Sequence, residues 1–319
     1  MTKILMSADW HINLHKKSVP YDWQVNRFKM FFESIYALEP QHDIHIIAGD
    51  VFDKKPQTDE ICLLLDYLNK CTIPTYIIPG NHEATRKGES FLEHFITHNA
   101  VNNDLVKIYT KNTRVIYDDF GIQFYPYGEM QKNNLPEHHP EDILITHIRG
   151  EIPPHVTEEY DFELIRPWRL TLLGDLHFYH KYKDFNVWYP GSPMNVTFDR
   201  NPTHEYGVLS IDSTNMKPDF IQLDLPKLLR ATISVGEDMV KDNWNHVIYE
   251  VTGSVDELAK VKDNVLLDKK IAHKPDEDSV LDLKDLSVLD ELKLYLEYSK
   301  VEDVSGIMVA FVDLNIGVE

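Results

Sequence analysis

The chain has 319 residues, an ordinary apolar content of 43% and a formal net charge of −20. This length allows one large domain plus an appendage. The negative net charge argues against a protein whose whole surface binds nucleic acid. The acidity does not exclude an enzyme that acts on nucleic acid, because bound divalent metal ions reverse the local charge.

The sequence predicts a protein of a reducing compartment without a membrane segment. Residues 1–10 read as a strand that already carries an Asp, which excludes a signal peptide. No apolar run approaches the roughly 20 residues that span a bilayer. The only cysteines, Cys62 and Cys71, have no second pair with which to build a metal site. We therefore expect reduced, structural thiols in a cytosolic compartment.

The first two predicted strands both end in residues that can bind a metal. Residues 3–8 form an apolar run that is followed by Asp9 and His11. Residues 43–48 form a second run, rich in isoleucine, and a glycine then leads to Asp50. Open α/β sheets place their sites at the carboxyl ends of strands. Because a carboxylate has two oxygens, Asp50 can bridge two metal ions about 3.5–4 Å apart.

Helices are predicted between the strands. Apolar residues at helical spacing indicate a crossover helix over residues 22–38, a second helix with Thr58 as its N-cap, and a third over residues 90–99. From residues 106–127 the apolar pattern shortens towards a period of two. We expect antiparallel strands there, in a second sheet.

A third strand, residues 74–79, is followed by Asn81, His82 and Glu83. Asn81 offers a neutral oxygen ligand, and His82 would lie beside the metals as a catalytic group. Two interpretations of Glu83 stay open. It either fixes the tautomer of the His82 ring from behind the ligands, or it is a solvated acid at the start of a helix.

Two later strands add further ligand types. Residues 143–147 end in His147, and residues 170–177 end in His177. A lone histidine at a strand end is usually structural. As the fifth and sixth features of one series, however, both histidines are predicted metal ligands.

The chain changes character after residue 225. Residues 226–275 alternate as strands and include a capping box, Ser254 with Glu257, which predicts a helix through residue 262. This is a small α/β unit of its own. Residues 276–319 form a leucine-rich tail, predicted to be helical, so we expect a core over residues 1–225, a small domain and a tail.

Basic residues follow the ligand positions closely. Their repetition behind successive strand ends favours a basic rim around an acidic, metal-filled centre, although any single pair could be solvated loop residues. As tentative DNA-binding residues we take Lys16, Lys17, Lys54, Lys55, Arg86, Lys87 and Arg149.

The strand-end residues occur in the order of the calcineurin-like metallophosphoesterases, and within them the chain resembles SbcD, the nuclease subunit of the SbcC–SbcD complex. The likeness is closest at residues 49–53 and 189–193, with Phe198. The motifs that carry it are Asp9-x-His11, Gly49-Asp50-x-x-Asp53, Gly80-Asn81-His82-Glu83, His147 and Gly174-x-x-His177.

The resemblance implies an α/β fold, a two-sheet α/β/β/α sandwich with a small α/β capping domain and a helical C-terminal tail. It also implies two divalent metal ions, Mn²⁺ first and Mg²⁺ as an alternative. His82 would be the catalytic histidine, and Asp53 and Glu83 would lie behind the ligands. The implied ligands are Asp9, His11, Asp50 and His177 for the first ion, and Asp50, Asn81, His147 and Asp175 for the second.

The function implied is hydrolysis of DNA phosphodiester bonds, as an exonuclease or endonuclease, by metal-activated water. The capping domain would face DNA, and the tail would dock onto an SbcC-like coiled-coil ABC-type ATPase. A homodimer within a heterotetramer is expected, working in recombination, repair or replication in a bacterial or phage-infected cytosol. The donor set suits Mn²⁺ or Mg²⁺, although its histidines leave zinc or iron open.

One residue departs from the family pattern. Similar proteins usually read Gly-His-x-His where this chain reads Gly174-Asp175-Leu176-His177. A carboxylate can still ligate manganese, but a lost ligand and a weakened second site is the alternative. Two other functions also stay open. The same core could carry a small-molecule phosphatase or phosphodiesterase, or the chain could be a weakly catalytic scaffold for an ATPase.

Overall fold

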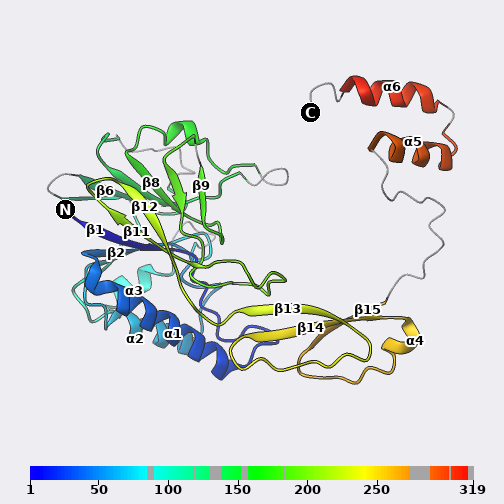
Figure 1. The fold of residues 1–319 in the computed structure, drawn as a ribbon. Coiled ribbons are helices and arrows are strands. Elements are labelled where there is room, and N and C mark those ends of the chain that lie inside the picture. The colour runs from blue at the N-terminus through cyan, green and yellow to red at the C-terminus, as the bar shows by residue number, and fades with distance from the viewer. Residues whose placement is uncertain are drawn as a thin grey trace. The chain divides into compact units, whose positions relative to one another are not determined.

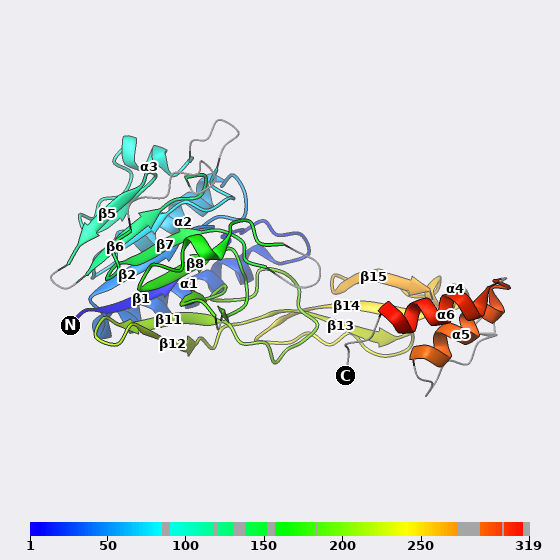
Figure 2. The same cartoon turned by 90° about the horizontal axis from the view of Figure 1, so that it is seen from above.

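The computed structural model describes residues 1–84, 90–117, 120–129, 138–151, 157–182, 184–272, 288–301 and 303–314 (Figures 1 and 2). By internal contacts the chain divides into two compact units. The first comprises Met1–Ala231, Asp238–Tyr249 and Asn264–Asp268, and the second comprises Thr232–Glu237, Glu250–Asp263 and Lys269–Glu319.

The first sheet of the first unit has six strands in the order β12-β11-β1-β2-β3-β4. The four strands β1 to β4 are parallel, whereas β11 and β12 extend the sheet antiparallel beside β1. The strands span Lys3–Ser7 (β1), Ile44–Ala48 (β2), Thr75–Ile78 (β3), Val106–Ile108 (β4), Gly207–Asp212 (β11) and Lys217–Gln222 (β12).

Three helices pack on one face of this sheet: α1 (Tyr21–Leu38), α2 (Thr58–Leu68) and the short α3 (Glu93–Thr97), with the 3₁₀ turn η1 (Glu39–Gln41) after α1. The predicted stripe of α1 is buried as expected. The predicted cap of α2 is wrong by one residue. Gln57 is the N-cap and forms a capping box with Glu60, because the Glu60 side chain reaches back to the backbone N–H of residue 57.

The second sheet also has six strands, in the order β5-β6-β7-β8-β10-β9. Its central strands β6, β7, β8 and β10 are parallel, and β5 and β9 are antiparallel edges. The strands span Thr113–Ile116 (β5), Gly121–Tyr125 (β6), Ile143–His147 (β7), Leu170–Gly174 (β8), His180–Tyr182 (β9) and Val187–Tyr189 (β10).

The expectation for residues 106–127 is therefore only partly right. The strands β5 and β6 pair antiparallel in the second sheet as predicted. The strand β4 instead runs parallel to β3 in the first sheet. The reason is the crossover through α3, which returns the chain to the first sheet before it leaves for the second.

The two sheets pack face to face, and their shared core consists of buried aliphatic and aromatic residues such as Met6, Ile46, Phe124 and Leu172. The predicted two-sheet sandwich is confirmed. Over the outer face of the second sheet, the described residues place the 3₁₀ helix η3 (Phe162–Leu164) and the turn after it, packed in a third apolar cluster. Figure 1 shows the first sheet between the helices and the second sheet.

After the sandwich, a three-stranded sheet has the order β13-β14-β15. Its strands span Leu228–Ser234, His246–Gly253 and Leu267–Ala272. The predicted capping box of Ser254 and Glu257 is present and opens α4 (Val255–Leu258), which is shorter than expected. The boundaries predicted at residues 225 and 275 stay predictions.

The tail contains two helices that contact each other, α5 (Val288–Tyr298) and α6 (Val304–Leu314). Both helices lie within residues 276–319, and the predicted helical tail is confirmed. None of the helices in the described ranges combines the length and apolar character that crossing a membrane requires.

Candidate metal centre

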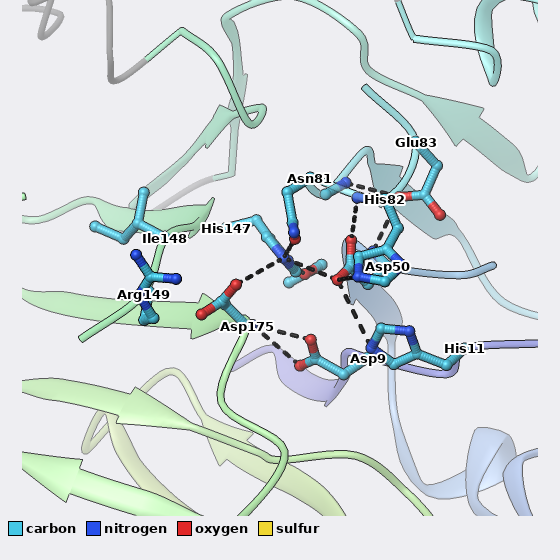
Figure 3. A network of polar contacts seen from close by, with 12 residues as sticks. Asp9, His11, Asp50, Asn81, His82, Glu83, His147, Ile148, Arg149 and Asp175 are labelled. Carbon is cyan, nitrogen blue, oxygen red and sulfur yellow. Dashed lines mark hydrogen bonds and ion pairs between the residues drawn. The ribbon is translucent and has the colours of Figure 1, made fainter. Parts of the chain in front are cut away.

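Polar residues from both sheets meet where five parallel strands end (Figure 3). The residues come directly after β1, β2 and β3 in the first sheet, and from the ends of β7 and β8 in the second. These strands deliver their carboxyl ends to one edge of the sandwich, which is where α/β sheets place ligands. The residues that meet are Asp9, His11, Asp50, Asn81, His82, His147, Asp175 and His177.

The backbone at four of these positions is left-handed. The φ angles are 55° at Asp9, 47° at His11, 51° at Asp50 and 106° at Asp175. Such a conformation costs a non-glycine residue about 1–3 kcal/mol and is concentrated at functional sites. The bends are held by backbone hydrogen bonds between the first two strand ends. Asp9 N–H donates to Gly49 O at 3.0 Å, and His11 N–H donates to Asp50 O at 2.9 Å.

Glycines allow the two sheets to approach each other here. A Cβ atom on Gly49 would lie 2.3 Å from His147 Nδ1, and one on Gly174 would lie 2.1 Å from the carbonyl oxygen of Ala48. This space lets His147 Nδ1 donate to that Ala48 carbonyl across 2.8 Å. Since a carbonyl only accepts, the proton is on Nδ1 and Nε2 is directed into the site.

Metal-binding side chains form three overlapping groups whose ligand atoms lie within 4.8 Å of one another. One group contains three of the four residues expected at the first ion. Another contains Asp50 and His147, which are expected at the second ion, together with Asp9, so that Asp9 and not Asp50 is common to these two groups. The third group shares His11 with the first and reaches His82. The groups are Asp9, His11 and His177; Asp9, Asp50 and His147; and His11, Asp53 and His82.

The unpaired atoms of this cluster suit a cation. The Asn81 side-chain oxygen lies 2.9 Å from His147 Nε2 and otherwise faces the acceptor oxygens of Asp50. Both ring nitrogens of His11 are buried and lack a hydrogen bond. Oxygen and nitrogen acceptors that converge without protons between them are the donor set of a divalent ion.

The electrostatics of the cluster support the same conclusion. Burial lowers the pKa of His147, but the carboxylates of Asp50, Asp9 and Asp175 outweigh burial and raise that pKa to about 10. Burial also raises the pKa of Asp9 well above its usual value. The site therefore attracts positive charge, which a proton or a metal ion can supply.

The family to which the chain belongs follows from its match to a known family model. The family model of the calcineurin-like phosphoesterases matches residues 2–179. The chain belongs to this family.

A curated relative of this phosphoesterase is the probable exonuclease subunit 1 of Escherichia phage T5. It is 38% identical over 312 residues, which cover 95% of this chain and 94% of the relative. Among solved structures, the protein TT1561 of Thermus thermophilus is 13% identical and covers 68% of this chain and 97% of that chain, with a TM-score of 0.40. The phosphoesterase Yfce from E. coli is 12% identical over 69% and 98%, with a TM-score of 0.34.

Glu83 has a role in this phosphoesterase that neither sequence interpretation named. It is fully buried, so it is not a solvated acid. It accepts backbone N–H bonds from Asp50 at 3.0 Å, Gly80 at 2.8 Å and Phe52 at 2.9 Å. Glu83 does not contact His82 Nδ1, because the Asp53 carbonyl oxygen takes that place. Burial and then the charge of Asp50 raise the pKa of Glu83 to about 7. Glu83 clamps the turns after β2 and β3 together.

His82 belongs to the third group, and its side chain is 34% exposed. Its backbone N–H donates to Asp50 Oδ1 at 2.9 Å, and its ring packs edge-on against His11 with centroids 4.7 Å apart. The ring is therefore held at the rim, and Nε2 lies 3.9 Å from Asp50 Oδ2.

Asp53 and Asp175 both lie beside the histidines of this cluster. Asp53 lies 3.5 Å from His11 Nδ1 and accepts from Asn13 Nδ2 at 2.7 Å. Asn13 was missed, although its alternation with Asp9 and His11 is a usable signal. The Asp175 N–H donates to Asp9, and its Oδ1 lies 3.8 Å from His147 Nε2.

The basic residues divide into four sets. Lys16, Lys17 and Lys54 line one pocket of about 680 Å³ together with Phe198 and Arg230. Lys55 is exposed and is not part of that pocket's lining. Arg149 lines a different pocket beside Asp175. Arg86 and Lys87 lie outside the described residues, so their predicted role is not addressed.

A first prediction concerns the backbone contacts by which Glu83 holds the turns after β2 and β3 together. Glu83→Gln replaces an acceptor by an amide whose N–H₂ group would face backbone N–H donors, so the free energy of unfolding should fall by roughly 1–3 kcal/mol. Affinity for Mn²⁺ should fall as well, because Asp50 loses its support. Denaturant unfolding and calorimetric metal titration measure both effects. Glu33→Gln, on the exposed face of α1, is the control, and a variant indistinguishable from it would refute the clamp.

Proposed function

We propose that the chain is a two-metal DNA nuclease, with exonuclease or endonuclease activity, that works as one subunit of an ATP-dependent complex of the SbcC–SbcD kind. The observation that carries the proposal is the lysine-lined pocket beside the metal centre in a chain of net charge −20. A positive pocket next to a phosphoesterase centre suits a polyanionic substrate. The exonuclease name of the phage T5 relative supports the same substrate.

The pocket adjoins the centre through a chain of contacts. Asn13 lines the pocket and donates to the Asp53 carboxylate, which faces His11. Lys16 is partly buried in the pocket wall, and its positive charge acts on Asp53. Lysines that bind phosphates here would hold the strand within reach of the metal groups, and they carry no base specificity.

Mn²⁺ is the first choice of metal and Mg²⁺ the second, because no thiolate is among the proposed donors. When bound, two such ions would neutralise a phosphodiester and lower the pKa of a water near it. Asp9, His11, Asp50 and His177 would hold one ion. Asp50, Asn81, His147 and Asp175 would hold the other.

The chain's own acid–base group is His82. Its backbone is anchored on Asp50, and its Nδ1 is turned towards the Asp53 carbonyl, so Nδ1 donates and Nε2 lies on the side of the Asp50 carboxylate, 3.9 Å from Oδ2. From the rim it would contact the scissile phosphate or give a proton to the leaving oxygen. Direct attack by water is proposed because the thiols do not suit a covalent step. Burial raises the pKa of Cys71 to about 11, and Cys62 lies exposed on α2.

The catalytic role is tested by His82→Gln. Turnover of linear duplex DNA with Mn²⁺ should fall roughly 10²–10⁴-fold because an acid–base group is lost, while two metals stay bound. His98→Gln, at an exposed histidine on the end of α3, is the control. Unchanged turnover in His82→Gln would remove His82 from the mechanism. Hydrolysis of small phosphodiesters without any cleavage of DNA would favour the small-molecule phosphodiesterase instead.

The role of Asp175 is tested by two substitutions. Asp175→Asn should weaken binding of the second metal ion, since a neutral amide replaces an anionic ligand. Asp175→His should retain both ions and keep or modestly raise activity. Manganese titration followed by calorimetry and by rate separates affinity from turnover, with the exposed Asp184→Asn as control. Native metal dependence in Asp175→Asn would show that Asp175 is not a ligand.

The tail is the proposed docking segment for a coiled-coil ABC-type ATPase. In α5 the side chain of Leu296 is buried, whereas Leu289, Tyr295 and Tyr298 are exposed, as are Ile307 and Val309 in α6. Apolar side chains gathered on a helical pair suit a protein partner. The proposed assembly contains a homodimer within a heterotetramer and acts in recombination, repair or replication in the cytosol of a bacterium or a phage-infected cell.

Truncation before Val288 tests the docking. The shortened chain should lose its complex with an SbcC-like coiled-coil ATPase, yet keep manganese-dependent activity on short single strands, because the metal groups lie in the sandwich. Co-purification measures the complex. Tyr298→Asp in the full chain should weaken the complex, and Lys300→Glu, at an exposed polar position, is the matched control. Full ATPase binding by the truncated chain would overturn the docking role.

A further inference from the structure

A second pocket opens beside the metal centre, and it shares no lining residue with the lysine pocket. It has a volume of about 440 Å³ and is lined mainly by nonpolar atoms. Two of its lining residues, Asp175 and His177, belong to the centre itself, so whatever occupies the pocket lies directly beside the reacting phosphate. The other lining residues include Arg149, Glu151, Leu176 and Phe178.

Phe178 is the main aromatic surface of this pocket. It is 50% exposed, which is unusual for a phenylalanine in the middle of a folded domain. It directly follows His177 in the sequence. A large apolar ring left accessible next to a phosphoesterase centre is a candidate for stacking on a planar ligand.

The ring is held in place from behind. It packs edge-on against His204, with centroids 4.9 Å apart, and lies 5.8 Å from Tyr206. Asp199 orients both partners, because its carboxylate lies 2.5 Å from His204 Nδ1 and accepts from the Tyr206 hydroxyl at 2.9 Å. A ring fixed on one side and open on the other loses little entropy when a ligand stacks on it.

The backbone beneath the ring is fixed as well. Gly191 has a φ of +75°, and a Cβ atom there would lie 2.7 Å from the carbonyl carbon of Phe178. Ser192 N donates to His177 O at 3.0 Å. The segment that carries His177 and Phe178 is thus tied to the loop after β10, which couples the position of the ring to that of the metal-binding histidine.

Charge distinguishes the two pockets. The first presents Lys16, Lys17, Lys54 and Arg230 against the single carboxylate of Asp268. In the second, the carboxylates of Glu151 and Asp175 outnumber the one guanidinium of Arg149. A phosphate is favoured in the first pocket and disfavoured in the second, whereas a neutral, planar base with N–H donors is compatible with the carboxylates.

We propose that the pocket of Phe178 is a nucleobase subsite, in which the base next to the scissile phosphate stacks on the open face of the Phe178 ring. This inference rests on the proposed DNA substrate and specifies how it is held. The strand would run from the lysine pocket across the metal groups, and one unpaired base would turn into the second pocket. Stacking accepts every base, so the subsite adds affinity without sequence preference.

Binding of single strands to the metal-free protein tests the subsite. Oligothymidine is compared with an abasic chain of equal length, which has the same phosphates and no bases, and fluorescence anisotropy gives the two dissociation constants. Phe178→Leu, which keeps an apolar side chain but no ring face, should reduce the preference for oligothymidine roughly tenfold. Its affinity for the abasic chain should stay unchanged, and Phe178→Trp should keep the preference.

The control is Ile116→Ala, at a 72% exposed position on the edge strand β5, and it should bind like the native chain. An unchanged preference in Phe178→Leu would overturn the subsite. Cleavage of DNA with Mn²⁺ is followed separately. A native chain that cleaves DNA while Phe178→Leu keeps the full preference refutes the subsite alone, whereas a native chain that cleaves no DNA refutes the nuclease function.

Discussion

The close approach of the two sheets beside Ala48 is the constraint on which the metal centre depends. His147 belongs to the second sheet, yet its Nδ1 donates to the Ala48 carbonyl in the first. Only glycine at positions 49 and 174 leaves room for this contact. The bond fixes the tautomer and aims Nε2 at Asp50, 3.4 Å away. The sandwich thus brings candidate ligands from two separate sheets to one point. Neither sheet alone could supply the whole set.

Charge balance explains why this point attracts a cation. Three carboxylates, those of Asp9, Asp50 and Asp175, surround one imidazole, and like charges at such distances raise each other's free energy. Glu83 adds a fourth carboxylate behind them, but three backbone N–H donors compensate its burial. The clamp therefore stabilises the turn that presents Asp50.

Much of this arrangement could be predicted from the sequence. An apolar run predicts a strand, and the Asp, Asn or His that follows it predicts a candidate ligand at the end of that strand. The strands β1, β2, β3, β7 and β8 and the residues after them are confirmed in position. Roles that depend on distant backbone could not be predicted. Glu83 bonds to amides 31 and 33 residues away as well as to a local one, and the ring of Phe178 packs on His204 and Tyr206, which come much later in the chain.

The two pockets show how an acidic chain can hold an acidic polymer. A net charge of −20 offers no long-range attraction for DNA, so binding must come from short-range groups concentrated near the metals. In the proposed nuclease, lysines in one pocket would neutralise phosphates, and the apolar, slightly acidic second pocket would take a base. A duplex end would satisfy both only after a base leaves its stack. The cost of unstacking would then discriminate against intact duplex interiors and in favour of frayed ends.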